Sequence, residues 1–477
     1  MSIDRKGTEM KPVAMARRPF LRSMAGSSLL GQGILAKLLA EDAPLQSDDP
    51  LAPKMPHFEP KAKNVIFLFM SGGVSHVESW DPKPKLFADH GKTISVREFQ
   101  GRKGDFQMFL KQPQWSFSPH GQCGTEVSGL FPHMARCVDD LCVIRSMQSD
   151  HTNHYEATLG IHTGSFTFAR PSFGSWVSYG LGTVNRNLPS FVVIAPHTPY
   201  AGGQVWASDF LPGAHQGTLV VPGQEPVANL RPRTATEELQ KTELELLDRL
   251  NQRHLAERPD DPLLMARIRS FETAFGMQSA MPEVFDLAQE DRRTLAMYGL
   301  EPGSHQGFAW QCLVARRLVE RGVRFVELID VGSSNNWDAH GDMLTHAPLA
   351  KNVDQPIAAL LQDLKQRGML EDTLVVWTTE FGRTPFNAAK DAKGREHHHW
   401  VFSSWIAGAG VKPGMVYGES DEHGIEVGRD PVHVHDFHAT LLHLLGLDHT
   451  RLTYRYSGRD YRLTDIHGKL IHPIMVG

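Results

Sequence analysis

Histidine is the residue type whose distribution first indicates chemistry in this sequence. The chain has 25 histidines among 477 residues, and 13 of them lie in the 147 residues from position 331 to the C-terminus. Histidine titrates near neutral pH and is also the commonest metal ligand in proteins. We therefore expect metal or acid/base chemistry in the last third of the chain.

Carboxylates accompany these histidines. The candidate metal ligands in this region are Asp338, His340, Glu380, His397, His398 and His399. Asp338 and His340 are two positions apart on an expected loop, so both side chains can turn toward one ion. Carboxylates and neutral imidazoles that converge from separate loops are the ligand set expected for Zn²⁺ or Mn²⁺. The residue types therefore predict a metal site that these loops share.

Each group also has an ordinary structural interpretation. Asp338 could form a turn or cap a helix, and Glu380 could pair with Arg383 in a structural ion pair. The three consecutive histidines could belong to a solvated loop. What favours a common site is the placement of all the groups where strands are expected to end.

Continuous apolar runs predict the strands that position these groups. They occupy residues 64–70, 191–195, 324–330, 373–379 and 404–407. Runs of this kind are typical of strands that are buried on both faces of a parallel sheet. The polar groups follow these runs, and ligands collect at the carboxyl ends of strands in open α/β sheets.

Helical patterns connect the expected strands. Apolar residues recur at helical spacing from Val353 to Leu364, with Gly368 suited to end the helix, and a second helix is expected at 308–320. Strand–helix–strand units of this kind predict the α/β class. We expect a doubly wound, mostly parallel sheet with helices on both faces.

The N-terminal residues have the pattern of an export signal. Arg17-Arg18 is followed by Phe20-Leu21 and a weakly apolar run rich in small residues, so residues 1–41 resemble a twin-arginine signal peptide. The run is too short and too rich in Gly and Ser to span a bilayer stably. A merely basic N-terminus is the alternative interpretation.

The rest of the chain divides into a linker and one large domain. Residues 42–60 are rich in proline and predict a linker, and residues 61–477 predict the domain. Residues 225–300 are charged and predict a helical insertion, in which Thr234 with Glu237 fits a capping box and Asp261-Pro262 fits a helix start. No other segment is expected to span a membrane. The net charge of −5 leaves no basic field for nucleic acid.

Several motifs resemble those of one bacterial family. They are residues 64–76 (Asn-Val-Ile-Phe-Leu-Phe-Met-Ser-Gly-Gly-Val-Ser-His), 81–84 (Asp-Pro-Lys-Pro), 377–385 (Trp-Thr-Thr-Glu-Phe-Gly-Arg-Thr-Pro) and 456–460 (Tyr-Ser-Gly-Arg-Asp). The chain is similar over nearly its whole mature length to the domain-of-unknown-function family fifteen hundred and one. That family is placed by similarity in the alkaline phosphatase and sulfatase-like superfamily, so the resemblance implies an alkaline phosphatase-like fold.

The resemblance also implies where metal would bind. Superfamily members hold one ion with an Asp, a nearby His and a late His, which match Asp338, His340 and one of His397, His398 or His399. The second ion takes an Asp at the end of the first strand and a later Asp-His pair. Here the first strand ends in Met70-Ser71-Gly72, and the later pair is Glu380-Phe381. The resemblance therefore implies one divalent ion, zinc or manganese.

The catalytic residues depart from the sulfatase pattern. No Cys or Ser of the chain has the Pro and Arg that formylglycine formation requires, which disfavours a conventional sulfatase. Ser75 and His76, on the turn after the first strand, are the candidates for nucleophile and base, although Gly72-Gly73 could simply form a tight turn. Arg383 would steady an anionic group. His151 and His154 are expected to face the same crevice.

These observations predict an exported, metal-dependent hydrolase of phosphate, sulfate or related esters. Its expected partners are a small-molecule or glycan ester substrate and the twin-arginine translocase, and its expected location is the periplasm or cell envelope. The alternative is a non-catalytic cell-envelope binding protein on the same fold, which the incomplete metal constellation favours.

Overall fold

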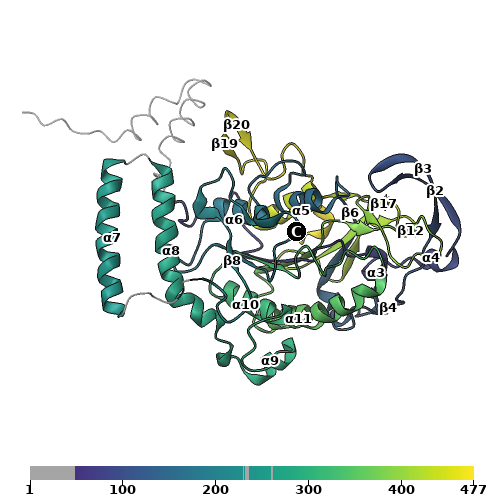
Figure 1. Ribbon diagram of the computed structural model, residues 1–477, viewed down its shortest axis with the longest axis horizontal. Coiled ribbons are helices and arrows are strands. Elements are labelled where there is room, and N and C mark those ends of the chain that lie inside the picture. Colours follow the sequence, from purple (N-terminus) through teal and green to yellow (C-terminus); the bar gives the residue numbers. More distant parts are fainter. Residues whose placement is uncertain (1–48, 229, 231–235, 259–260) are drawn as a thin grey trace, which may run out of the picture. The chain divides into compact units, whose positions relative to one another are not determined.

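The computed structural model describes residues 49–477 except 229, 231–235 and 259–260 (Figure 1). The expected signal peptide, the first part of the expected linker and Thr234 lie outside the described residues. Within the described part, no helix is long and apolar enough to cross a membrane.

A nine-stranded sheet forms the centre of the domain. Along the sheet its strands are β15 (Met415–Tyr417), β6 (Leu141–Gln148), β14 (Phe402–Gly408), β10 (Thr373–Thr378), β1 (Asn64–Phe69), β9 (Phe325–Ile329), β7 (Phe191–Ile194) and β8 (Thr218–Val220), and β18 (Val432–His433) pairs with β6. Every pairing in this sheet is parallel except those of β14 with β10 and β6. The parallel strands therefore bring their carboxyl ends to one edge.

Helices cover both faces of this sheet. One core contains alternate residues of β1, β9 and β10 packed against α10 (Phe308–Glu320) and α11 (His346–Gln366). The other contains the intervening residues of the same strands packed against α5 (His154–Thr163), α6 (Phe173–Leu181) and α12 (Val434–Leu444). Because both faces are covered, all residues of β1 after Asn64 are buried, and each large apolar side chain contributes about 1.5–3 kcal/mol.

The segment 225–300 contains three described α-helices: α7 (Glu237–Glu257), α8 (Pro262–Phe285) and α9 (Arg292–Tyr298). The hydroxyl of Thr236 caps α7 by accepting from the amide of Leu239, so the cap lies two residues after the predicted Thr234. Asp261 caps α8 by accepting from the amide of Leu264, as the sequence predicts.

Shorter elements make up the rest of the described chain. They are α3 (His76–Ser79), α4 (Pro84–Ala88), β2 (Thr93–Phe99), β3 (Arg102–Leu110), β4 (Phe117–His120), β5 (Thr125–Ser128), β11 (Gly382–Arg383), β12 (Phe386–Asn387), β13 (His397–His398), β16 (Glu419–Ser420), β17 (Val427–Arg429), β19 (Tyr454–Tyr456) and β20 (Arg459–Tyr461). Strands β2 and β3 form a hairpin that joins β12 in a three-stranded sheet.

The predicted fold class is confirmed by this topology. All five predicted strands are present, and helix 308–320 has the predicted bounds. One expectation was wrong: the run 404–407 belongs to the antiparallel strand β14, because its chain enters from the edge where the other strands end. Strand β6 was not predicted.

Candidate metal centre

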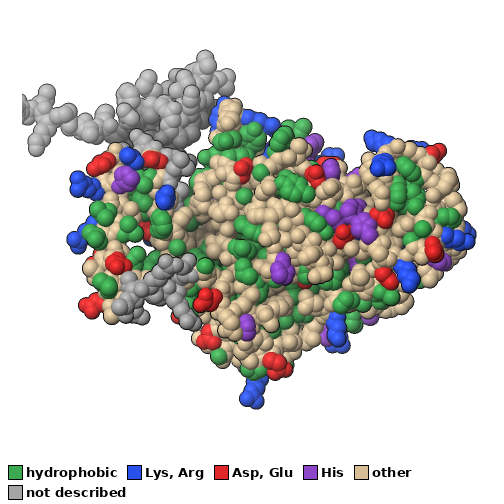
Figure 2. Space-filling view, viewed as in Figure 1, with side chains coloured by type: hydrophobic (Ala, Val, Ile, Leu, Met, Phe, Trp, Pro, Cys, Tyr) green, Lys and Arg blue, Asp and Glu red, His purple; other side chains and the backbone are tan. Residues whose placement is uncertain are grey.

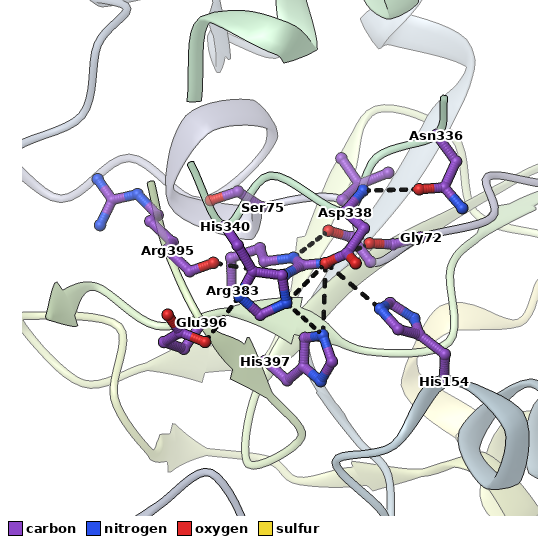
Figure 3. A network of polar contacts seen from close by, with 12 residues as sticks. Gly72, Ser75, His154, Asn336, Asp338, His340, Arg383, Arg395, Glu396 and His397 are labelled. Carbon is purple, nitrogen blue, oxygen red and sulfur yellow. Dashed lines mark hydrogen bonds and ion pairs between the residues drawn. The ribbon is translucent and has the colours of Figure 1, made fainter. Parts of the chain in front are cut away.

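One carboxylate forms the centre of the polar groups at this edge. Oδ1 of Asp338 lies 3.0 Å from Nε2 of His340 and 3.4 Å from Nε2 of both His154 and His397. Nη2 of Arg383 lies 2.6 Å from the same oxygen (Figure 3). We call Asp338, His154, His340 and His397 the Asp338 centre.

These residues come from different parts of the fold. Asp338 lies on the loop after β9, His154 is the first residue of α5 after β6, and His397 lies in β13. Histidine side chains gather beside acidic ones in the surface view, near the notch between the body of the domain and the β2–β3 hairpin (Figure 2). The sheet topology thus assembles a centre from segments distant in sequence.

Each histidine of the centre is held through its other ring nitrogen by an acceptor. Nδ1 of His154 lies 2.6 Å from Oε1 of Glu380, and Nδ1 of His340 lies 2.7 Å from Oε2 of Glu396. Nδ1 of His397 lies 2.6 Å from the carbonyl oxygen of Thr152. An acceptor at Nδ1 keeps the proton there, so Nε2 is the nitrogen that can present a lone pair.

Among the described residues, no ordinary hydrogen-bond donor faces the Nε2 atoms of these three histidines. Nε2 of His154 is buried and has no hydrogen bond of good geometry, only the 3.4 Å contact with Oδ1 of Asp338. Nε2 of His340 and Nε2 of His397 are 2.9 Å apart. Two lone-pair nitrogens at this distance repel unless a proton or a cation lies between them. Ligand atoms of His154, Asp338 and His397 all lie within 4.8 Å of one another, as a metal site requires.

Local strand pairing decides which of the three consecutive histidines joins the centre. Strand β13 pairs antiparallel with β11, and His397 lies opposite Arg383. Successive side chains of a strand point to opposite sides, so His398 points away, and its Nε2 lies 2.7 Å from the carbonyl of Ile425. His399 packs its ring against Trp400. The expected late ligand is therefore His397.

Arg383 is buried completely and holds Asp338 in place. Its Nε donates to the carbonyl of Gly73 (2.9 Å), and its Nη2 donates to the carbonyl of Gly72. Gly72 has φ +114°, and a Cβ there would lie 2.6 Å from the amide nitrogen of Trp337. Only glycine allows this close approach of the turn to the Asp338 loop.

The carboxylates of this region remain ionised despite their burial. Burial raises the pKa of Asp338, but hydrogen bonds from the three histidines and the charge of Arg383 outweigh it and lower this pKa well below its ordinary value. Burial likewise opposes ionisation of Glu380, yet the hydrogen bond with His154 lowers its pKa overall. The centre therefore keeps charged carboxylate oxygens beside the ring nitrogens, as a cation site requires, with Arg383 offsetting part of their charge.

His340 stands at the exposed rim of the centre. Hydrogen bonds to Asp338 and Glu396 raise its pKa to about 9. Its side chain is 41 % exposed, whereas that of His154 is 8 % exposed. A proton on Nε2 of His340 thus occupies the position that a cation could take.

The structure brings together six of the residues named from the sequence and leaves the others out of the centre. Those that meet are Asp338, His340, Glu380, Arg383, His397 and His154, with Glu380 behind His154. Ser75 and His76 do not form a nucleophile–base pair: the hydroxyl of Ser75 is fully buried without a partner, and Nε2 of His76 lies 2.9 Å from the carbonyl of Gly424. His76 instead stacks on His398.

Sequence reasoning gave no role to three residues that support the centre. Glu396 orients His340, Tyr200 stacks on His154 with ring centroids 4.2 Å apart, and Asn336 accepts from the amide of Asp338. Tyr200 follows β7 and could have been found by the strand-end rule. Glu396 directly precedes the histidine triplet, but nothing in its spacing indicates a contact with His340.

A second cluster has a similar composition. Nε2 of His433 lies 3.1 Å from Oδ1 of Asp150, and ligand atoms of Asp150, His433 and His435 lie within 4.8 Å of one another. Nδ1 of His433, however, accepts from the backbone amide of His435 at the start of α12. The proton of this ring must therefore be on Nε2, where it faces Asp150.

Comparison with known proteins identifies the family. Residues 62–475 match the family described as Protein of unknown function (DUF1501). The chain belongs to this family. The DUF1501 match spans the sheet, both helical layers and the Asp338 centre. Comparison with curated proteins gives no match.

Solved structures similar to this DUF1501 chain include three enzymes. The lipoteichoic acid synthase LtaP from Listeria monocytogenes has a TM-score of 0.35 at 8% identity, covering 87% of this chain and 79% of its own. A phosphonate monoester hydrolase from Silicibacter pomeroyi has 0.35 at 10% identity, covering 86% and 76%. Alkaline phosphatase from the Antarctic bacterium TAB5 has 0.31 at 12% identity, covering 77% and 96%.

Proposed function

We propose that this DUF1501 protein is a metal-dependent hydrolase of phosphate, sulfate or related esters that binds one divalent ion, zinc or manganese, at the Asp338 centre. The observation that carries the proposal is the ring geometry: three histidines direct Nε2 toward one carboxylate oxygen while an acceptor holds each Nδ1. Metal-binding histidines are held in this way by outer partners.

The donor set fits such an ion. Imidazole nitrogens and a carboxylate are ligands of Zn²⁺ and Mn²⁺. The buried Nε2 of His154 has only a long contact with Asp338, and this supports the fit because a buried ring nitrogen without a well-formed hydrogen bond is costly. No carboxylate follows β1, where Ser71 and Gly72 stand, so the proposal includes one ion.

Each residue at the Asp338 centre would have a separate role. His154, His397 and Asp338 hold the ion, with His340 as a fourth ligand at the rim. Glu380 and Glu396 keep two of the rings oriented, and Arg383 anchors Asp338 through its buried guanidinium. When bound, a divalent ion polarises an ester oxygen and acidifies water near neutral pH. Because Arg383 directs its donors to Asp338 and two carbonyls, we assign it positioning rather than substrate contact.

His340 distinguishes the hydrolase from the alternative. If all four side chains bind one tetrahedral ion, no position remains for water or substrate, which is typical of structural metal sites. That closed arrangement would favour the non-catalytic cell-envelope binding protein. A hydrolase needs the position of His340 to open, and its exposed side chain supports this possibility.

Elemental analysis of the full chain tests the proposal. We expect one ion per chain, lost in His154→Gln and His397→Gln and retained in the control His472→Gln, whose side chain is exposed. His340→Gln should keep the ion and hydrolyse a panel of phosphate and sulfate esters. A wild type that binds neither zinc nor manganese would refute the metal centre, and unchanged hydrolysis by Asp338→Ala would refute its role.

Export through the twin-arginine route to the periplasm or cell envelope is part of the proposal. It is supported by Arg17-Arg18 and the apolar run that follows. Replacing Arg17 and Arg18 by Lys should retain the protein in the cytoplasm, as fractionation would show. Normal export of that variant would contradict the signal.

A further inference from the structure

Trp400 differs from most tryptophans of this protein. Of the nine in the chain, six are buried almost completely, whereas Trp400 is 42 % exposed. An indole left in contact with water loses the stabilisation that its burial would provide. Its exposure close to the Asp338 centre therefore suggests a ligand that packs on it.

Trp400 forms one wall of a polar cavity. The cavity has a volume of about 590 Å³, and Gln148, Glu426, Arg429 and Asp430 also line it. Its volume lies in the range of about 300–1,000 Å³ that is typical of ligand sites. Val427 and Pro431 line it as well. A flat indole with further apolar groups and nearby amide and carboxylate groups suits a ligand with an apolar face and hydroxyls at its edge.

The charges of this cavity favour an uncharged ligand. The single lining cation, Arg429, is paired with Glu419 at 2.7 Å and approaches Asp430 at 3.4 Å. Among the described residues, the carboxylate of Glu426 has no ion-pair partner. An anionic group would be repelled here, whereas carboxylates accept hydrogen bonds from hydroxyls.

The cavity is attached to the same segments that build the centre. The side-chain amide of Gln148 donates to the carbonyl of Trp400 (3.1 Å), and the amide of Ser149 donates to the carbonyl of His399 (3.0 Å). The chain continues from Ser149 to His154 and runs back from Trp400 to His397. Three residues span at most about 11 Å, so the backbones of Trp400 and His397 lie within that distance of each other.

We propose that this cavity is a carbohydrate subsite in which an uncharged sugar ring stacks on Trp400. Its hydroxyls would bind Glu426, Asp430 and the amide of Gln148. A neighbouring sugar of the same chain would carry the anionic ester to the Asp338 centre. The identity of the substrate as a glycan ester rests on the proposed function, whereas binding of the sugar ring does not require the ion.

Isothermal titration calorimetry of the full chain tests this subsite. The probes are two neutral oligosaccharides, cellohexaose and chitohexaose. We expect a neutral hexasaccharide to bind and to reduce acrylamide quenching of the wild-type tryptophan fluorescence. Trp400→Ala should raise its Kd at least about tenfold, and Trp400→Phe should raise it less because a ring remains. Phe275→Ala, which removes a ring that is 46 % exposed on α8, is the matched control.

The outcomes separate this inference from the proposed hydrolase. Asp338→Asn should lose the ion and hydrolysis yet bind the neutral hexasaccharide like the wild type. A wild type that hydrolyses simple esters but binds no hexasaccharide would overturn the subsite and leave the hydrolase standing. Unchanged binding by Trp400→Ala would also overturn it.

Discussion

The Asp338 centre and the cluster of Asp150, His433 and His435, which we call the Asp150 cluster, have similar compositions, but their histidines are hydrogen-bonded in opposite ways. In the Asp338 centre, Nδ1 of each histidine faces an acceptor, which leaves Nε2 for a cation. In the Asp150 cluster, Nδ1 of His433 accepts from a backbone amide, so Nε2 carries the proton and pairs with Asp150. The atom behind each ring therefore decides whether histidines and a carboxylate form a metal centre or a helix cap.

The largest expected effect is the loss of a ligand. His397→Gln should bind no ion at stoichiometric zinc, because it removes the nitrogen that lies 3.4 Å from Oδ1 of Asp338 and 2.9 Å from Nε2 of His340. His433→Gln should keep one ion per chain. Elemental analysis of both variants after dialysis compares the two clusters directly. Equal loss in both would contradict the distinction between them.

The stability of the folded protein at acid pH should show that the Asp150 cluster has a structural role. Burial, with the charges of His433 and His467, lowers the pKa of His435 to about 4 from the usual 6.5. The unfolded chain then binds more protons between these values, so stability falls as the pH decreases from 6.5 to 4, by about 3 kcal/mol for this group. Denaturant unfolding of His435→Gln at pH 7 and pH 4.5 should show a smaller loss than the wild type. An unchanged loss would indicate other groups.

Changing an outer partner should weaken the metal centre without removing a ligand. In Glu380→Gln an uncharged amide would replace the carboxylate at Nδ1 of His154, so the ring would lose the negative charge that fixes its proton on Nδ1 and strengthens Nε2 as a ligand. We expect zinc affinity to fall about 10–100-fold, measured by competition with a chelator. Asp150→Asn is the matched change in the other cluster and should leave the affinity unaltered.

The smallest expected effect concerns the tip of the β2–β3 hairpin. Nε2 of Gln100 lies 3.0 Å from Oε2 of Glu396, which in turn holds His340. Gln100 is exposed, so Gln100→Ala should lower zinc affinity by less than about tenfold, below the effect of Glu380→Gln. The same chelator competition measures it. A larger loss would mean that the hairpin, and not Glu396 alone, positions His340.

The strands and the metal candidates could be predicted from local patterns. The apolar runs at 64–70, 324–330 and 373–379 predict buried parallel strands because residues buried on both faces must be apolar. Asp338 and Glu380 follow such runs, so the strand-end rule places them at one edge. The antiparallel direction of β14 could not be predicted in this way, because a short apolar run has the same composition in a parallel and in an antiparallel strand.

The sequence by itself determined the fold class, the edge of the sheet where the site lies and the candidate set around Asp338 and His340. Only the tertiary structure decided that His397 joins them while His398 does not. The pairing of β13 with β11, in which His397 lies opposite Arg383, sets the side of the strand on which each histidine lies. The tertiary structure also brought His154, and behind it Glu380, to the same point. Which histidine joins the centre depends on contacts between segments far apart in the chain. The position of the ring proton, which those contacts set, decides whether a histidine can bind a metal ion or caps a helix.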